Sequence, residues 1–238
     1  MERKTLELIH GAEDSWWYQG RTAVITSILR RLHVRGEEGI LDFGAGYGAM
    51  REPLSAFGPD VYAFEPDGPA SVESRKRGYT KVFETADEAL SRRYGLVGLF
   101  DVVEHIEDDR AFLSRLRSSV DEGGHVAITV PAYQWLWSVH DVNNHHFRRY
   151  TKRRLVTLLQ DVGYEIDYAG YWNAVLLLPA AILRVLGMTG ESALSGRGFI
   201  DALFLAIIRA EALFARFIPL PFGVSVIVVA HPRTTTGR

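Results

Sequence analysis

The stretch GILDFGAGYG at residues 39–48 decides the fold class. It begins with an apolar run of strand length and continues into three closely spaced glycines, Gly44, Gly46 and Gly48. Glycine lets the backbone turn tightly, and it lets a ligand approach where a Cβ atom would clash. A glycine-rich turn directly after an apolar strand is typical of nucleotide-type cofactor sites in α/β proteins.

An acidic residue ends the next expected strand, VYAFEPD at 61–67. Glu65 follows Gly44 by 21 residues, and at about this spacing an acid can accept hydrogen bonds from ribose hydroxyls. The glycine turn and Glu65 together predict a site for a ligand that contains a ribose.

Apolar strands alternate with helical segments along most of the chain. We expect further strands at 81–85, 96–106, 123–133, 164–172 and 223–231, and helices at 21–34, 109–119 and 151–163. This alternation indicates βαβ units and a parallel sheet, which is an α/β fold. Residues 174–219 are unusually apolar and predict two helices separated by a loop at 188–198.

Composition narrows the class of protein. The chain has 238 residues, which fits one α/β domain. Its formal net charge of −2 creates no global field for nucleic acid, and its lack of cysteine excludes disulfides and cysteine nucleophiles. The first 21 residues do not have the pattern of a signal peptide. We expect a cytoplasmic protein, with association to a membrane left open.

The glycine spacing separates two kinds of cofactor. Dinucleotide sites carry G-x-G-x-x-G, whereas this chain has G-x-G-x-G with Asp42 two positions upstream. A carboxylate repels a pyrophosphate, which is also negatively charged, but it attracts the positively charged ammonium and sulfonium groups of S-adenosyl-L-methionine. The spacing disfavours the rival interpretation, a nicotinamide-dependent oxidoreductase.

These motifs resemble those of the class I S-adenosylmethionine-dependent methyltransferases. Residues 42–48 resemble the first motif of that family, Glu65 its ribose-binding acid, and 101–105 the segment after its fourth strand. Residues 16–21, 104–105, 140–141 and 146–151 are similar to a bacterial and archaeal branch. The resemblance implies a Rossmann-like, seven-stranded, mostly parallel sheet with helices on both faces and a helical insertion before the last strand.

The resemblance also implies the cofactor, its product S-adenosyl-L-homocysteine, and the organisation of one domain over 1–238. Within it we expect an N-terminal lid and helix at 1–35, a cofactor-binding core at 36–173, an apolar insertion at 174–219, and the last strand and tail at 220–238. Asp87 is the best match to the acid that faces adenine, although this position is not obvious in the sequence. The residues expected to bind the cofactor are Asp42, Phe43, Gly44, Ala45, Gly46, Gly48, Glu65, Pro66, Asp87, Asp101, Val102 and His105.

A histidine-rich loop follows the fifth strand and contains His140, Asp141, His145 and His146. Histidine is the side chain best suited to accept a proton near neutral pH, as a hydroxyl acceptor would require. A metal site and a purely structural loop are the alternatives. We select His140 and His146 as catalytic candidates and assign no metal ligand. For His105 we favour closing the cofactor pocket over acting as a base.

Five residues are expected to contact substrate: Trp17, Tyr18, Arg21, Arg149 and Tyr150. The aromatic residues at 16–18 form either a lid over the site or a staple that fixes the first helix to the core. The basic run at 148–154 suits either a phosphate-bearing acceptor or a solvated helix start, and it is too short to indicate nucleic acid binding.

The apolar segment 174–219 gives the clue to the acceptor. Its first apolar run has ten residues (174–183), far fewer than the ~20 that a membrane-spanning helix needs. A helix that is apolar on most sides must pack against core, a partner or lipid. We expect an enzyme that methylates an oxygen of a small or lipid-like acceptor, with a homodimer or peripheral membrane contact through 174–219. The alternatives are an N- or C-methyltransferase of a small molecule and a non-catalytic cofactor-binding scaffold.

Overall fold

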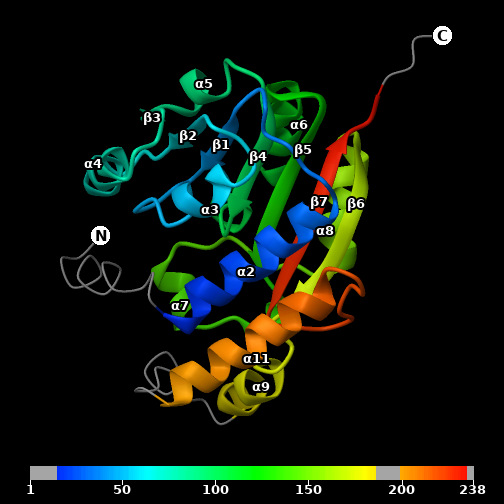
Figure 1. Ribbon diagram of the computed structural model, residues 1–238. Helices are drawn as coiled ribbons and strands as arrows, with labels where there is room; N and C mark the ends of the chain where they lie inside the picture. The colour runs from blue at the N-terminus through cyan, green and yellow to red at the C-terminus, as the bar shows by residue number, and fades with distance from the viewer. Residues whose placement is uncertain (1–14, 186–198, 235–238) are drawn as a thin grey trace.

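A seven-stranded sheet organises the protein, with the strand order β3-β2-β1-β4-β5-β7-β6. The computed structural model describes residues 15–185 and 199–234, and Figure 1 shows the arrangement of the elements. Neighbouring strands from β3 to β5 are parallel, whereas β7 runs antiparallel to both β5 and β6. The strands are β1 (Ile40–Phe43), β2 (Val61–Phe64), β3 (Lys81–Phe83), β4 (Tyr94–Phe100), β5 (Val120–Pro131), β6 (Tyr164–Trp172) and β7 (Ser225–Pro232). The predicted α/β fold with a mostly parallel sheet is confirmed.

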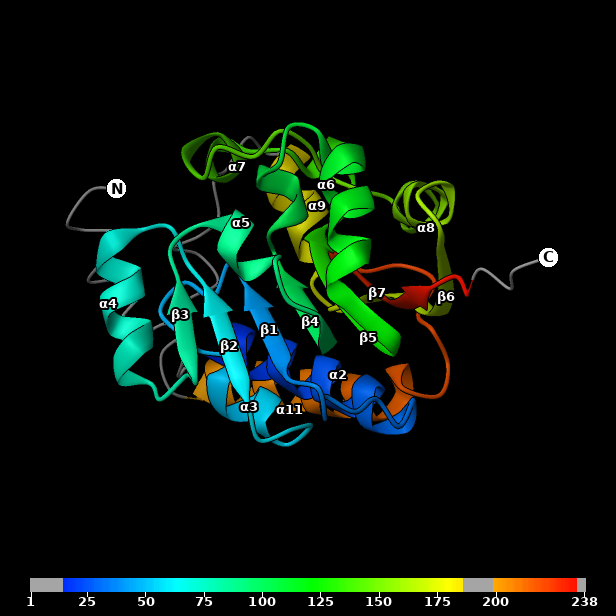
Figure 2. The ribbon, with the colours of Figure 1, turned by 90° about the horizontal axis from the view of Figure 1, so that it is seen from above.

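Helices cover both faces of the sheet (Figure 2). One apolar core lies between the sheet and α6 and α8, and the other between the sheet and α2, α3 and α11. Because both faces are covered, every residue of the central strands β1 and β4 is buried. The helices are α2 (Trp16–Arg31), α3 (Arg51–Ser55), α4 (Gly68–Lys76), α5 (Ala86–Ala89), α6 (Asp109–Leu116), α7 (Val139–Asn143), α8 (Lys152–Asp161), α9 (Leu177–Val185) and α11 (Phe199–Ala215), with short 3-10 turns η2 (Val103–His105), η3 (Arg117–Ser119) and η4 (Gln134–Leu136).

The first helix begins earlier than its apolar pattern predicts. Ser15 caps α2 by accepting a hydrogen bond from the backbone N–H of Tyr18, so the aromatic residues at 16–18 lie inside the first helical turn. Trp16 packs against Phe204 and Trp17 against Trp172, with ring centroids 5.3 and 4.8 Å apart. These contacts favour the staple over the lid. The part of the expected lid at residues 1–14 lies outside the described residues.

The described parts of the apolar segment contain the helices α9 and α11, and its expected loop at 188–198 lies outside the described residues. Helix α11 lies beside α2 (Figure 1), and a Cβ atom on Gly20 would lie 2.6 Å from Ile208. Buried Glu211 accepts hydrogen bonds from the backbone N–H groups of Asn173 and Ala174, which fixes α11 to the end of β6. In the described part of the chain, no helix combines the length and apolar character needed to cross a membrane.

The parallel strands determine where a site can form. The carboxyl ends of β1, β2, β4 and β5 meet at one edge of the sheet, and ligands of open α/β sheets bind in the crevice outside such an edge. The glycine turn, Glu65, residues 101–105 and the histidine loop follow these four strands in that order.

Candidate functional site

The glycine turn after β1 has the left-handed backbone that its sequence predicts. Gly44, Gly46 and Gly48 have φ values of +78°, +56° and +84°, which glycine adopts without steric cost. A Cβ atom on Gly44 would lie 2.7 Å from Cγ2 of Val102, so this glycine allows the turn after β1 to pack against the segment after β4. A Cβ atom on Gly46 would meet nothing within 4 Å. The turn therefore presents open space at Gly46.

Glu65 joins the ends of β1 and β2. Its Oε2 atom accepts a hydrogen bond from the backbone N–H of Gly46 at 2.7 Å, and its Oε1 atom accepts one from Asp67 at 2.9 Å. Burial raises the pKa of this carboxyl, and the two backbone N–H groups offset part of that effect. A carboxylate oxygen can accept more than one hydrogen bond, so Glu65 can hold the turn and still accept bonds from ligand hydroxyls.

Asp42 is a buried acid beneath the turn. Its Oδ2 atom accepts a 2.6 Å hydrogen bond from the Tyr79 hydroxyl. Burial raises the pKa of Asp42 to about 6, because the hydrogen bond from Tyr79 and the charge of Arg21 offset only part of the desolvation. A cation bound nearby would stabilise the charged form of this acid.

Asp101 connects the end of β4 to helix α2. Its Oδ2 atom accepts a 2.6 Å hydrogen bond from Nη1 of Arg21, and its Oδ1 atom accepts one from the Thr129 hydroxyl at 3.0 Å. Its φ of +59° is unusual for a residue with a side chain. The backbone reversal directs the next residues, Val102 to His105, across the carboxyl ends of the strands.

The histidine loop is organised by Asp141. This buried carboxylate caps α7 through the backbone N–H of Ser138 and accepts a bidentate pair from Arg149, at 2.7 and 2.9 Å. It also bonds Nδ1 of His146 at 2.9 Å. Burial alone would raise the pKa of Asp141, but the bonds from His146 and Arg149 outweigh it and hold the pKa well below its usual range. His146 thus has a fixed ring orientation.

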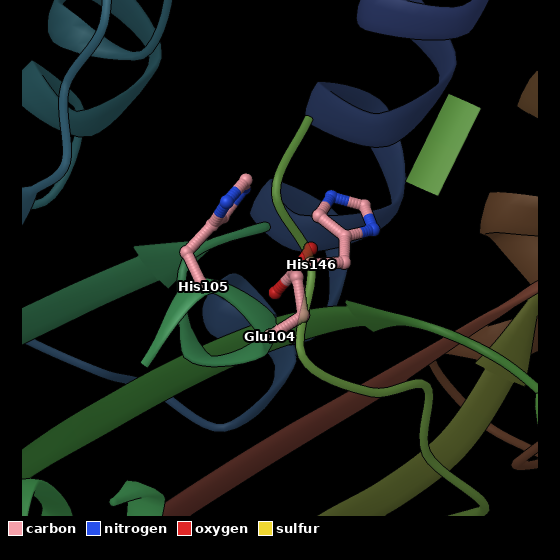
Figure 3. A group of neighbouring side chains, drawn as sticks. All are labelled: Glu104, His105 and His146. Carbon is pink, nitrogen blue, oxygen red and sulfur yellow. The ribbon is translucent and has the colours of Figure 1, made fainter. Parts of the chain in front are cut away.

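Residues 104–105 connect the histidine loop to the segment after β4. The backbone N–H of Phe147 donates to the carbonyl of Glu104 at 2.8 Å. The rings of His105 and His146 are edge to face, with centroids 4.6 Å apart (Figure 3). Partial desolvation and the nearby His146 lower the pKa of His105. His140 is exposed, bonds Asn144, and lies 6.1 Å from His146 between ring centroids.

Some expected site residues lie elsewhere. Phe43 is in the core against Phe64 and Phe112, so only its backbone remains for a ligand. The side chain of Asp87 is 84% exposed and pairs with Arg115 of α6, and its contact with adenine stays a prediction.

The side chains expected to contact substrate differ in their burial and in the residues that they contact. Tyr150 is fully buried and donates its hydroxyl to Asp109, so the expectation of a substrate contact does not hold in this structure. Arg149 is committed to Asp141, and Trp17 packs on Trp172. Tyr18 lies on the same turn as Arg21, and the guanidinium carbon of Arg21 is 4.7 Å from the centroid of the Tyr18 ring.

Two residues expected to bind the cofactor lie beside other residues of that expected set. Ala45 is half-buried between Gly44 and Gly46, and Pro66 is exposed next to Glu65.

Sequence reasoning selected His105 but not its neighbour Glu104. The side chain of Glu104 is completely buried, and neither carboxylate oxygen has a hydrogen-bond partner among the other residues of 15–185 and 199–234. Burial raises the pKa of Glu104 well above its usual value, and the charge of Asp101 adds to this. The available signal was its position beside His105, directly after a buried strand.

Comparison with known proteins identifies the family. A sequence model of the methyltransferase domain matches residues 16–169, which is more than half of the chain. No curated protein matches the sequence.

Solved structures share the fold at low sequence identity. An S-adenosylmethionine-dependent methyltransferase from Clostridium acetobutylicum ATCC 824 is 10% identical with a TM-score of 0.60, over 91% of this chain and 92% of that one. One from Archaeoglobus fulgidus is 17% identical with a TM-score of 0.56, over 88% and 93%. Magnesium protoporphyrin IX methyltransferase from Synechocystis PCC 6803, solved with bound S-adenosylhomocysteine, is 18% identical with a TM-score of 0.55, over 91% and 84%. The chain belongs to the methyltransferase domain family, and it has the fold of the class I S-adenosylmethionine-dependent methyltransferases.

Proposed function

We propose that this protein transfers a methyl group from S-adenosylmethionine to a hydroxyl oxygen of a small or lipid-like acceptor. The observation that carries the proposal is the Asp141–His146 pair beside the carboxyl ends of the strands. An imidazole that a carboxylate holds in one orientation is the usual partner for a hydroxyl that must lose its proton.

The glycine turn and its acids fit the cofactor. The open space at Gly46 is where a Cβ atom would exclude a ligand, and Glu65 has lone pairs left for ribose hydroxyls. The carboxylates of Asp42 and Asp101 suit a cationic ligand. The desolvation of buried Asp42 is only partly offset by the Tyr79 hydroxyl and the charge of Arg21, so a further positive charge nearby would stabilise its ionised form. When bound, S-adenosylmethionine supplies a methyl group on a positively charged sulfur and leaves as S-adenosylhomocysteine.

The remaining chemistry belongs to the chain's own residues. A hydroxyl acceptor must lose its proton as its oxygen takes the methyl group, and the cluster around His146 is the place for that proton. Positioning of the acceptor and exclusion of water supply most of the rate of such a displacement. Val102 packs on Gly44, and His105 lies against His146, so residues 102–105 link the cofactor half to the acceptor half.

The lipid-like nature of the acceptor is supported by the outer surface of α11 and the residues after it. Leu213, Phe214, Phe217 and Ile218 are exposed large hydrophobic side chains. Beside them, a groove between α2 and α11 is lined by Arg30, Arg31, Arg209 and Arg216. Exposed apolar side chains next to arginines suit a surface with anionic headgroups. We infer that this face docks on an anionic lipid surface, from which the acceptor would reach the site.

Two measurements test the proposed function. Calorimetry on the full chain should show one S-adenosylhomocysteine bound per protein. Incubation of extract with labelled S-adenosylmethionine, followed by mass spectrometry, should show a product in which an oxygen carries the label. Label on nitrogen or carbon would replace O-methylation with the alternative chemistry. Cofactor binding without transfer to any extract component would instead favour a non-catalytic scaffold.

A further inference from the structure

Glu104 is a buried acid that lacks the partners a buried acid needs. Its side chain is fully buried, and neither carboxylate oxygen forms a hydrogen bond with any other described residue. Buried carboxylates are normally paired with a cation or bound to a metal, because an isolated charge in a protein interior is costly. The hydrogen bonds of Tyr79 to Asp42 and of Arg149 to Asp141 show how this chain satisfies its other buried acids.

Two imidazoles converge on this carboxylate. Figure 3 shows His105 and His146 facing one another, with the Glu104 carboxylate beside His146. One ligand atom from each of the three side chains lies within 4.8 Å of the other two. Glu104 and His105 come from η2, whereas His146 comes from the loop after α7, so the fold itself brings the three groups together.

A hydrogen bond to Asp141 fixes the orientation of the His146 ring. Its Nδ1 atom bonds Asp141 at 2.9 Å, which leaves Nε2 as the nitrogen for a ligand. His105 bonds the backbone of Asn144, which likewise leaves one ring nitrogen. Metal-binding histidines usually donate their second N–H group to a carboxylate or carbonyl in this way.

We propose that Glu104, His105 and His146 bind one divalent transition-metal ion. Two imidazole nitrogens and a carboxylate suit zinc and the neighbouring divalent ions, and three protein ligands leave a coordination position open. His105 is exposed at the surface of the cluster, so the open position is accessible from outside. The ion would satisfy the unpartnered oxygens of Glu104.

The role of the ion rests on the proposed function. A metal-bound hydroxyl loses its proton more readily than a free one, as bound water does. The proton of a hydroxyl bound to the ion would pass to solvent water at the exposed side of the cluster as the oxygen takes the methyl group, and His146 would act as a ligand of the ion rather than as the base.

A second histidine–carboxylate group provides the control. His125, Asp167 and His231 also lie within 4.8 Å of one another. They lie at the opposite end of β5 from the histidine loop, and Asp167 is already bonded to His231 at 2.9 Å. Substituting His231 therefore removes a histidine from a similar cluster and leaves the three residues of the proposed site unchanged.

The test is cobalt titration of the full chain after chelation, followed by visible absorption and calorimetry. We expect one Co²⁺ per protein, with visible absorption bands that indicate nitrogen and oxygen ligands. His105→Ala, His146→Ala and Glu104→Gln should each lower the affinity for Co²⁺ by about 100-fold or more, because losing a ligand costs more than losing its supporting residue. His231→Ala should leave the affinity unchanged. Glu104→Gln keeps the shape of the side chain and removes a buried charge, so its thermal unfolding should show a folded protein.

The outcomes separate the metal site from the methyltransferase function. Absence of Co²⁺ binding in a folded wild-type protein, or loss of binding in His231→Ala alone, would overturn the metal site. Equal Co²⁺ affinity in Glu104→Gln, His105→Ala and wild type would overturn it as well. S-adenosylhomocysteine binding measured on the same samples tests the cofactor site of the proposed function independently, because neither the glycine turn nor Glu65 belongs to the metal site.

Discussion

The backbone N–H of Gly46 donates a 2.7 Å hydrogen bond to Oε2 of Glu65. This bond fixes the turn after β1 to the end of β2, while the second oxygen of Glu65 accepts from Asp67 at 2.9 Å. The Ser74 hydroxyl holds the carbonyl of Gly46 from the other side, at 2.7 Å. The turn is therefore preorganised without a ligand, and a cofactor that binds there does not bear the entropy cost of ordering it.

Gly46→Ala should abolish or strongly weaken S-adenosylhomocysteine binding. The new methyl group would occupy the open space at Gly46, where no protein atom lies within 4 Å. We expect the affinity to fall by at least ~10-fold, which corresponds to about 1.4 kcal/mol. Calorimetry on a protein whose circular dichroism matches the wild type would measure it.

Gly123→Ala is the matched control for that substitution. Gly123 also has a positive φ, +80°, and a Cβ atom there would also meet nothing within 4 Å. Both variants should lose ~1–2 kcal/mol of stability from the left-handed backbone, but only Gly46→Ala should lose binding. Equal affinity in the two folded variants would place the ligand away from the glycine turn.

Asp42 should make stability depend on pH. Its folded pKa of about 6 lies above the ordinary 3.8, so the folded state binds the proton more tightly than the unfolded state. The stabilisation is fully present below about pH 4 and is lost as pH rises through about 6. Relative to Asp42→Asn, the wild type should lose about 3 kcal/mol of unfolding free energy over that window. Urea unfolding of both proteins at pH 4 to 7 measures the difference, and a difference that stays constant with pH would contradict the assignment.

The features that the sequence predicted correctly are those that depend only on residues close together in the chain. The turn glycines, the buried strand before them and the acid at 65 all carry local signals, and the structure contains each of them. Apolar periodicity also predicted helix in the described parts of the segment 174–219, where α9 and α11 lie, because that signal does not depend on what the helices contact.

Contacts between distant segments were not predictable in this way. Tyr150 was expected at the substrate, but it forms a parallel bridge with Ala132 that buries it completely. The loop at 146–147 packs over η2, where the backbone N–H of Phe147 donates a hydrogen bond to the carbonyl of Glu104. The surroundings of the Glu104 side chain depend on this contact between distant segments. Periodicity does not specify such a contact, so the sequence could not show that Glu104 is buried without a hydrogen-bond partner from another described residue.

His146→Asn should reduce methyl transfer far more than His140→Asn. His146 is held by Asp141 and lies against His105, whereas His140 is exposed and bonded to Asn144. We expect turnover to fall by ~10²–10⁴-fold in His146→Asn, with unchanged affinity for S-adenosylhomocysteine, once the acceptor is identified from labelled extract. If both single variants and the double variant turned over as the wild type does, the histidine loop would have no role in proton removal.

The final prediction concerns the outer face of α11, which is more apolar than a helix that only covers the sheet requires. Ile208, Ala212 and Ala215 are buried against α2 and the sheet, as a covering helix requires, yet Leu213 and Phe214 are exposed on the other side. Arg31 lies over the ring of Phe217, at 5.3 Å from the centroid, so cationic and aromatic groups share this face. A face of this kind should bind vesicles that contain anionic phospholipid and should bind neutral vesicles poorly.

Phe214→Glu tests this docking surface, and Val72→Glu is its matched control. The two side chains are 66% and 54% exposed, but Val72 lies on α4, away from α11. Losing the burial of one Phe side chain costs ~1.5–3 kcal/mol, so Phe214→Glu should bind anionic vesicles at least ~10-fold more weakly in flotation, and Val72→Glu should bind like the wild type. Light scattering on the same proteins tests the alternative, in which a second copy of the chain covers this face. If the wild type ignored anionic vesicles and formed a dimer that Phe214→Glu dissociates, the face would belong to a second copy of the chain, because the same apolar side chains would then be covered by protein instead of lipid.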